Sequence, residues 1–193
     1  MMQRLRRMFR HRWLDENDTR RAIPPALAQR LAERVAASER RHSGEIRVYV
    51  EAGLPLSYLW REAPPRERAI AMFGKLRVWD TEQNNGVLIY LLLAEHAIEV
   101  VADRGLARHV PQAHWQEIVQ HMRGAFRAGR YEEGLAQAVD EVSALLEQHF
   151  PLARGQLVHR LACVVVDERS DEVLGQQRRD VVALVHHLAY GQR

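Results

Sequence analysis

The sequence has one cysteine, one lysine and no long hydrophobic run, and each shortage excludes a class of protein. A single cysteine, Cys163, cannot form an internal disulfide framework or a metal site built from several cysteines. No stretch of about 18 apolar residues is present, and the N-terminus lacks the apolar core of a secretory signal. We therefore predict a cytoplasmic protein without a membrane-spanning helix.

Because Lys75 is the only lysine, arginine supplies 27 of the 28 basic residues (28 − 1). Most of these arginines are scattered and form no dense stripe with interleaved aromatic residues, so we expect no nucleic-acid partner. The formal net charge is only +3, and 47% of the residues are apolar. This composition predicts one globular domain with appendages.

Sequence motifs of the common enzyme classes are also missing. The nucleophile elbow, the phosphate-binding P-loop, the glycine-rich dinucleotide turn and the two-histidine zinc motif do not occur. His109, His114 and His121 are not spaced as a chelating set, and Cys163 lies in an apolar run without an activating base. We therefore expect ordinary histidines and a cysteine that acts as a small core residue.

Residues 1–22 form a basic N-terminal segment that differs from the rest of the chain. Its first thirteen residues include five arginines and no acidic residue. Wound as a helix, they would place apolar side chains on one stripe, which suits an anionic surface at the inner membrane face or an acidic partner. A frayed, solvated terminus is the alternative. The predicted contact residues are Arg4, Arg6, Arg7, Phe9, Arg10 and Trp13.

The unbroken apolar run from Val87 to Leu93 predicts the strand around which the chain is organised. It has no polar position on either face, so we expect a central strand covered by helices on both sides. A second strand-like run follows after only three residues and ends on Asp103, which predicts an antiparallel hairpin. The side chains expected at one rim are those of Asp80, Asn84, Asn85, Asp103 and Arg104.

Helical and strand periodicities flank this hairpin. Residues 45–51 alternate as a strand, and a helix with Ile70, Phe73 and Leu76 inward follows. Residues 53–60 form a predicted loop whose Leu54, Leu56, Leu59 and Trp60 are too apolar to be fully exposed. Three further helices begin at or near proline or tyrosine, with inward stripes that include Leu27, Trp115 and Leu135. The last forty residues contain a strand-like run around Cys163 and a helical pattern over 173–188, and their place in the sheet is undetermined.

The rim residues are chemically suited to a hard cation. Two carboxylates and two amides, from Asp80, Asn84, Asn85 and Asp103, offer the oxygen ligands that calcium or magnesium prefers. Arg104 beside such a cation would bind a phosphoryl group. The alternative is plain turn chemistry, since Asn-Asn-Gly before a strand is common in turns.

Several pieces of the sequence, taken together, resemble the TPM-domain family. They include Phe73 to Leu76, Asn84 to Leu88, Ile98 to Leu106, Phe126 to Gly134 and His149 to Pro151. The resemblance covers about residues 26–151 and implies an α/β fold, a three-layer α/β/α sandwich with a small mixed sheet flanked by helices. It divides the chain into the N-terminal segment 1–22, a TPM-like domain 23–151 and a C-terminal extension 152–193.

The resemblance also implies divalent-cation binding in some members and a phosphatase activity ascribed to plant ones. Here Asn84 stands at a position that is often acidic in the family, which removes one charge from the cation site. No matched residue is an obvious nucleophile or general acid. We therefore expect an accessory domain that binds an unidentified protein partner at the membrane surface. The alternatives are a metal-dependent phosphatase and a cation that only stabilises the fold.

Overall fold

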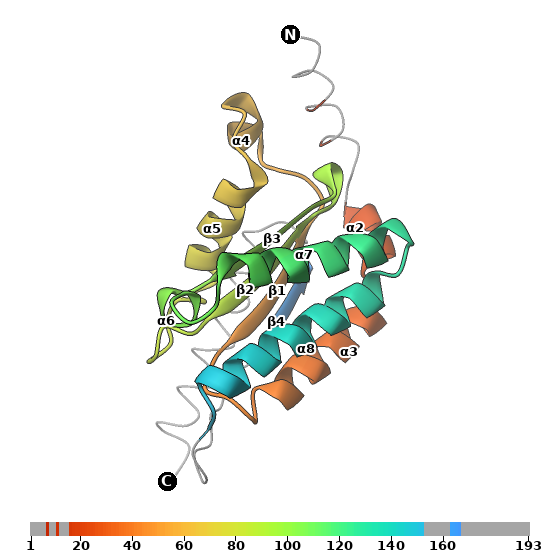
Figure 1. Cartoon of the computed structure of the whole chain (residues 1–193). Coiled ribbons are helices and arrows are strands. Elements are labelled where there is room, and N and C mark those ends of the chain that lie inside the picture. Colours follow the sequence, from red (N-terminus) through yellow and green to blue (C-terminus); the bar gives the residue numbers. More distant parts are fainter. Residues whose placement is uncertain (1–6, 8–10, 12–15, 153–162, 167–193) are drawn as a thin grey trace, which may run out of the picture.

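Four strands form one mixed sheet in the order β3-β2-β1-β4 (Figure 1). β1 pairs in parallel with both β2 and β4, whereas β2 and β3 form the antiparallel hairpin expected from the sequence. The computed structural model describes Arg7, His11 and residues 16–152 and 163–166. The strands are β1 (Ile46–Glu51), β2 (Val87–Leu92), β3 (Ala97–Ala102) and β4 (Cys163–Val166).

Strand β2 is buried along its whole length, as the unbroken apolar run predicts. Val87, Ile89 and Leu91 face one hydrophobic cluster, and Leu88, Tyr90 and Leu92 face a second cluster on the other side of the sheet. Side chains alternate along a strand, so a strand covered on both faces has no position for a solvated polar residue. This double burial explains why the run is uninterrupted.

Helices cover both faces of the sheet, which confirms the predicted three-layer α/β/α sandwich (Figure 1). α3, α7 and α8 pack on the face that carries Val87, and α4 and α5 cover the opposite face. The remaining short helices are α2, α6 and the 3-10 turn η1. The bounds are α2 (Glu16–Ala22), α3 (Pro25–Ser38), α4 (Leu56–Trp60), α5 (Pro65–Lys75), η1 (Leu93–Glu95), α6 (Arg104–Ala107), α7 (Gln112–Arg127) and α8 (Tyr131–His149).

Prolines begin three of the longer helices and set their positions. α3 and α5 carry proline in their first turn, and Pro111 caps α7. Proline is favoured there because its fixed φ suits the first turn and its missing N–H would have no helical partner. The inward stripes predicted from Leu27, Trp115 and Leu135 are buried.

Three apolar side chains are more exposed than predicted. Ile70 of α5 is 52% exposed, because α5 turns Arg68, Ala69 and Met72 inward instead. The segment predicted as a loop contains α4, in which Leu59 is buried but Leu56 and Trp60 are 65% and 80% exposed. Leu56 and Trp60 lie four residues apart, so they share the outer face of this short helix.

Strand β4 comes from the C-terminal extension, whose place in the sheet the sequence left open. Arg47 of β1 lies opposite Cys163, and Val50 lies opposite Val166. Among the described strands, β4 is therefore the outermost one beside β1. The helical pattern predicted over residues 173–188 lies outside the described residues.

A buried ion pair joins α5 to the sheet beneath it. Arg68 donates to both carboxylate oxygens of Glu51 at 2.6 to 3.1 Å, and the Tyr90 hydroxyl donates to Glu51 at 2.7 Å. Burial favours the neutral Arg68, but the hydrogen bond and charge of Glu51 outweigh it, so the Arg68 pKa is raised. Burial, and next the charge of Glu51, raise the pKa of Tyr90 well above its usual range. This pair explains why arginine occupies an inward position of α5.

We expect Glu51→Gln to lower the free energy of unfolding by about 3–5 kcal/mol, because it leaves the Arg68 charge buried without a counter-charge. Urea denaturation followed by circular dichroism measures the effect. The exposed Arg30–Glu132 ion pair provides the control, so Glu132→Gln should change stability little. Equal stability of wild type and Glu51→Gln would contradict this role for the pair.

Candidate functional site

The rim lies where the β2–β3 hairpin begins and ends, beside α6 (Figure 1). Two backbone hydrogen bonds join its halves: Asp103 N donates to Gly86 O at 2.8 Å, and Gly105 N donates to Asn84 O at 2.8 Å. The segments 84–86 and 103–105 are therefore in direct contact, although some twenty residues separate them in the sequence.

Two glycines allow this close approach. A Cβ atom on Gly86 would lie 1.8 Å from Val78 O, and one on Gly105 would lie 2.2 Å from Gln83 O. Both distances are far below van der Waals contact, and the obstructing atoms belong to the backbone. The rim therefore requires glycine at both positions.

Asn85 is fully buried at the rim and is held by the residues around it. Its backbone N–H donates to Thr81 Oγ1 at 2.9 Å, and its Nδ2 donates to Ser43 Oγ at 3.1 Å and to Gln83 Oε1 at 3.4 Å. Its amide oxygen Oδ1 is buried without a hydrogen-bond partner. Asn85 thus has a fixed side chain with one acceptor left unused.

Asp103 leaves a second buried acceptor unused. Its Oδ1 accepts from Arg104 N at 2.7 Å and caps α6, whereas Oδ2 is buried and has no hydrogen-bond partner. An unsatisfied buried polar group costs about 1–3 kcal/mol. The rim therefore holds two oxygens, on Asn85 and Asp103, that a bound cation or water would stabilise.

The other two predicted cation ligands, Asn84 and Asp80, are arranged differently. Asn84 adopts a left-handed backbone with φ 51°, and its Oδ1 accepts from Arg104 Nε at 3.3 Å and Nη2 at 3.2 Å. The positive guanidinium therefore occupies the oxygen that a cation would use at Asn84. Asp80 is exposed on the preceding turn, and within the residues the structure describes its carboxylate forms no hydrogen bond or ion pair with the other four rim residues.

The rim also contains three polar residues that the sequence pattern did not predict to lie there. Ser43, Thr81 and Gln83 position Asn85, and Ser43 comes from the loop before β1, about forty residues away. The turn composition around Thr81 was visible in the sequence, but the contribution of Ser43 depends on the fold. Among residues 16–152 and the other described positions, no three His, Cys, Asp or Glu residues gather as a metal site. A cation here would rely on amide and backbone oxygens.

The N-terminal segment is attached at the opposite end of the hairpin. Arg7 donates to Glu95 Oε1 at 2.6 Å and to Ala63 O at 2.7 Å. Leu54 N donates to Nδ1 of the buried His11, so Nε2 carries the proton and donates to Glu95 at 2.8 Å. Arg7 is thus used within the chain, and its predicted outside contact stays a prediction. Of the other predicted contact residues, Arg4, Arg6, Phe9, Arg10 and Trp13 lie outside the described residues.

No helix of the described part of the chain is both long enough and apolar enough to cross a bilayer.

We expect calcium or magnesium to raise the thermal unfolding midpoint by about 5–10 °C at one hundred times its dissociation constant, because a ligand of the folded state stabilises it. Differential scanning calorimetry with each ion and with a chelator measures the shift. Asp103→Asn should reduce it, whereas Asp80→Asn, at an exposed carboxylate, should leave it nearly unchanged. An identical midpoint with ions and with chelator would remove the cation site.

Comparison with known proteins identifies a structure with the same fold and a matching family. The NMR structure of the BA42 protein from the psychrophilic bacterium Bizionia argentinensis superimposes with a TM-score of 0.63 at 21% sequence identity. The match covers 74% of this chain and 95% of the BA42 chain, and it shows a shared fold. No curated protein matches the chain. The family described as the TPM domain matches residues 17–145, which is more than half of the sequence. The chain therefore belongs to the TPM domain family.

Proposed function

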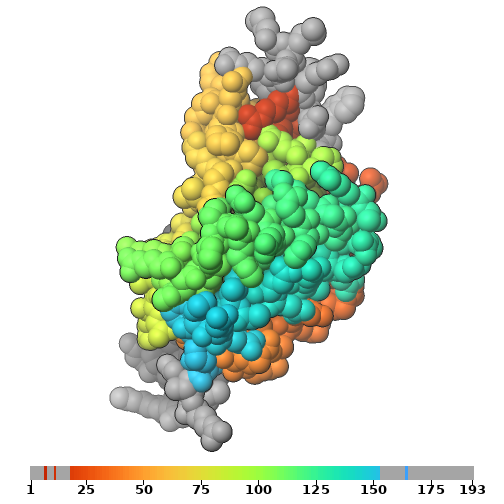
Figure 2. All heavy atoms as spheres, in the orientation of Figure 1, coloured from red at the N-terminus to blue at the C-terminus, as the bar shows by residue number. Residues whose placement is uncertain are grey.

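We propose that this chain is an accessory domain that binds a protein partner at the surface of a membrane, on its cytoplasmic side. The observation that carries the membrane part is the outer face of α4, where Leu56 and Trp60 are 65% and 80% exposed. α4 projects at one end of the molecule (gold in Figure 2). Large apolar side chains grouped at a projecting point are a feature of docking surfaces.

The basic segment is anchored next to this apolar face. Arg7 reaches Ala63 O just beyond α4, and His11 contacts Leu54 just before it. Four further arginines lie between residues 4 and 12 of the sequence. Tryptophan suits the membrane–water interface, and arginines are attracted to anionic headgroups. Together they provide the two signals that stable peripheral attachment needs.

We expect full-length protein to co-sediment with vesicles of phosphatidylglycerol and phosphatidylcholine, and Trp60→Ser to reduce the bound fraction by about threefold or more, since one interfacial aromatic side chain is lost. Trp79→Ser is the matched control, because Trp79 is 50% exposed but lies beyond the far end of α5. Its binding should stay close to wild type. Equal sedimentation of wild type and Trp60→Ser would contradict this attachment.

A metal-dependent phosphatase is the alternative function, and the unused oxygens of Asn85 and Asp103 are the observation in its favour. A cation held there would polarise a phosphoryl group and lower the pKa of a bound water, and Arg104 would stabilise the phosphate charge. The exposed Arg104 guanidinium would first have to leave Asn84. This route needs no protein nucleophile.

The phosphatase alternative predicts hydrolysis of p-nitrophenyl phosphate with magnesium or calcium, and a fall of about a hundredfold or more in Asp103→Asn, as is usual when a metal ligand or its electrostatic partner is lost. Release of p-nitrophenol measures the rate. Arg104→Lys should raise KM more than it lowers kcat, because a two-pronged phosphate contact becomes a point charge. Equal background rates in wild type and Asp103→Asn would exclude catalysis at the rim.

A further inference from the structure

Among the strands that the structure describes, β3 is the outermost on its side of the sheet and pairs with β2 alone. Its pairing register fixes which backbone groups point outward. The bond from Asp103 N to Gly86 O makes these two residues a hydrogen-bonded pair. Bonded and non-bonded pairs alternate along an antiparallel ladder, so Ile98, Val100 and Ala102 direct their N–H and C=O groups away from β2. Arg66 of α5 already donates to the outward Val100 O at 2.5 Å, which confirms this direction. The other outward groups of Ile98, Val100 and Ala102 can therefore pair with another strand.

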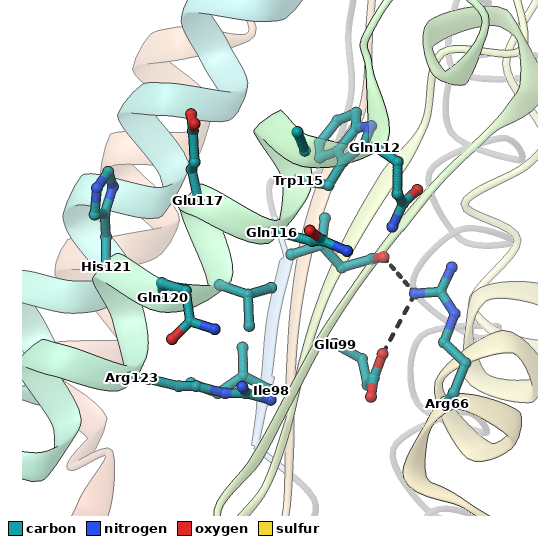
Figure 3. Close-up of a pocket in the computed structure, with 13 residues that line it drawn as sticks. Arg66, Ile98, Glu99, Gln112, Trp115, Gln116, Glu117, Gln120, His121 and Arg123 are labelled. Carbon is teal, nitrogen blue, oxygen red and sulfur yellow. Dashed lines mark hydrogen bonds and ion pairs between the residues drawn. The ribbon is translucent and has the colours of Figure 1, made fainter.

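A groove runs along this edge between β3 and α7. One cavity of about 610 Å³ is lined by Ile98, Val100, Trp115 and Val119 together with glutamine side chains. A second cavity of about 610 Å³ continues it toward Phe126 and shares Ile98 and Arg123 with the first. Figure 3 shows Gln116, Gln120 and Arg123 extending from α7 toward β3. The groove thus combines an open strand edge with an apolar wall and polar side chains.

The groove is lined by three arginines and three glutamates. Glu95 pairs with Arg7 and His11, and Glu117 lies 3.9 Å from His114. Arg66 lies 3.5 Å from Glu99, whereas Arg123 and Arg127 form no ion pair with any described residue. The glutamine side chains of α7 that line the groove are neutral. Figure 3 places Glu117 and His121 on the side of α7 away from the strand. An acidic ligand therefore complements Arg123 and Arg127, the two arginines of the groove that no described carboxylate neutralises.

We propose that the β3–α7 groove binds an extended acidic peptide segment of a partner protein, which adds to the sheet as a fifth strand beside β3. Its backbone pairs with the outward N–H and C=O groups of Ile98 and Ala102 and with the Val100 N–H, while Val100 O stays bonded to Arg66. Alternate apolar side chains of the peptide pack toward Trp115 and Val119. Its acidic side chains face Arg66 and Arg123. This inference rests on the proposed partner binding and names the site and the chemistry of that partner.

A second copy of the chain fits this edge less well than an acidic peptide does. Pairing of two β3 edges would bring Arg66 and Arg123 of one copy toward the same residues of the other, with like charges opposed. Such juxtaposition is unfavourable across an interface. An acidic peptide relieves the same charges.

The probe is a fluorescein-labelled nine-residue peptide that alternates valine with glutamate, measured by fluorescence anisotropy against full-length protein. A peptide that alternates valine with lysine is its control. We expect saturable binding of the glutamate peptide only, weakened about tenfold or more by Arg123→Glu, which reverses a charge at the groove. Lys75→Glu, at the exposed end of α5 on the other face of the sheet, should change binding by less than about threefold. No binding of the glutamate peptide at about 1 mM, the weak limit of specific affinity, would overturn the proposal.

Amide hydrogen exchange by NMR separates strand addition from loose charge attraction. Peptide binding should slow exchange at the outward amides of Ile98, Val100 and Ala102. Binding without this protection would overturn the strand model. Protection of these amides in the free protein would also overturn the strand model. Protection that depends on protein concentration would assign the edge to a second copy, and protection that does not would assign it to another segment of the same chain. Peptide binding that fails while vesicle sedimentation persists would remove the groove and leave the membrane attachment intact.

Discussion

The pairing register of β2 with β3 is the constraint on which the rest of the structure depends. Val87 lies opposite Ala102, and Ile89 lies opposite Val100. A shift of one residue would turn every side chain of one strand to the wrong face. Val100 would then leave the α7 side of the sheet, and Asp103 would no longer meet Gly86. Both the rim and the β3–α7 groove are consequences of this register.

The sequence was most informative where burial is simple. The unbroken apolar run indicated a strand covered by helices on both faces, which β2 is, and the resemblance to the TPM-domain family implied the three-layer sandwich. The burial predicted for Leu56 and Trp60 was wrong, because hydrophobic residues were assumed to be buried. The inward orientation predicted for Ile70 was also wrong, because Arg68 takes the inward position of α5. A buried arginine is expected only when its charged partner, here Glu51, is known.

The rim was only partly predictable for a related reason. Hairpin geometry brings Asn84, Asn85, Asp103 and Arg104 to one end, but hydrogen bonding decides what each can do there. The Arg104 guanidinium donates to Asn84 Oδ1, whereas Asn85 and Asp103 each keep a buried oxygen without a hydrogen bond. Contacts from distant segments, such as Ser43 on Asn85, cannot be read from local spacing. Membership of the TPM domain family establishes the fold, while function depends on these local arrangements.

The most direct test of the hairpin register is solution NMR of the backbone. The register predicts a scalar coupling through the hydrogen bond between the Asp103 amide nitrogen and the Gly86 carbonyl carbon. It also predicts a strong Hα–Hα contact between Val87 and Ala102, which form a close, non-bonded pair. A contact from Val87 to Val101 or Asp103 in its place, with no coupling between Gly86 and Asp103, would contradict the register, the rim and the groove together.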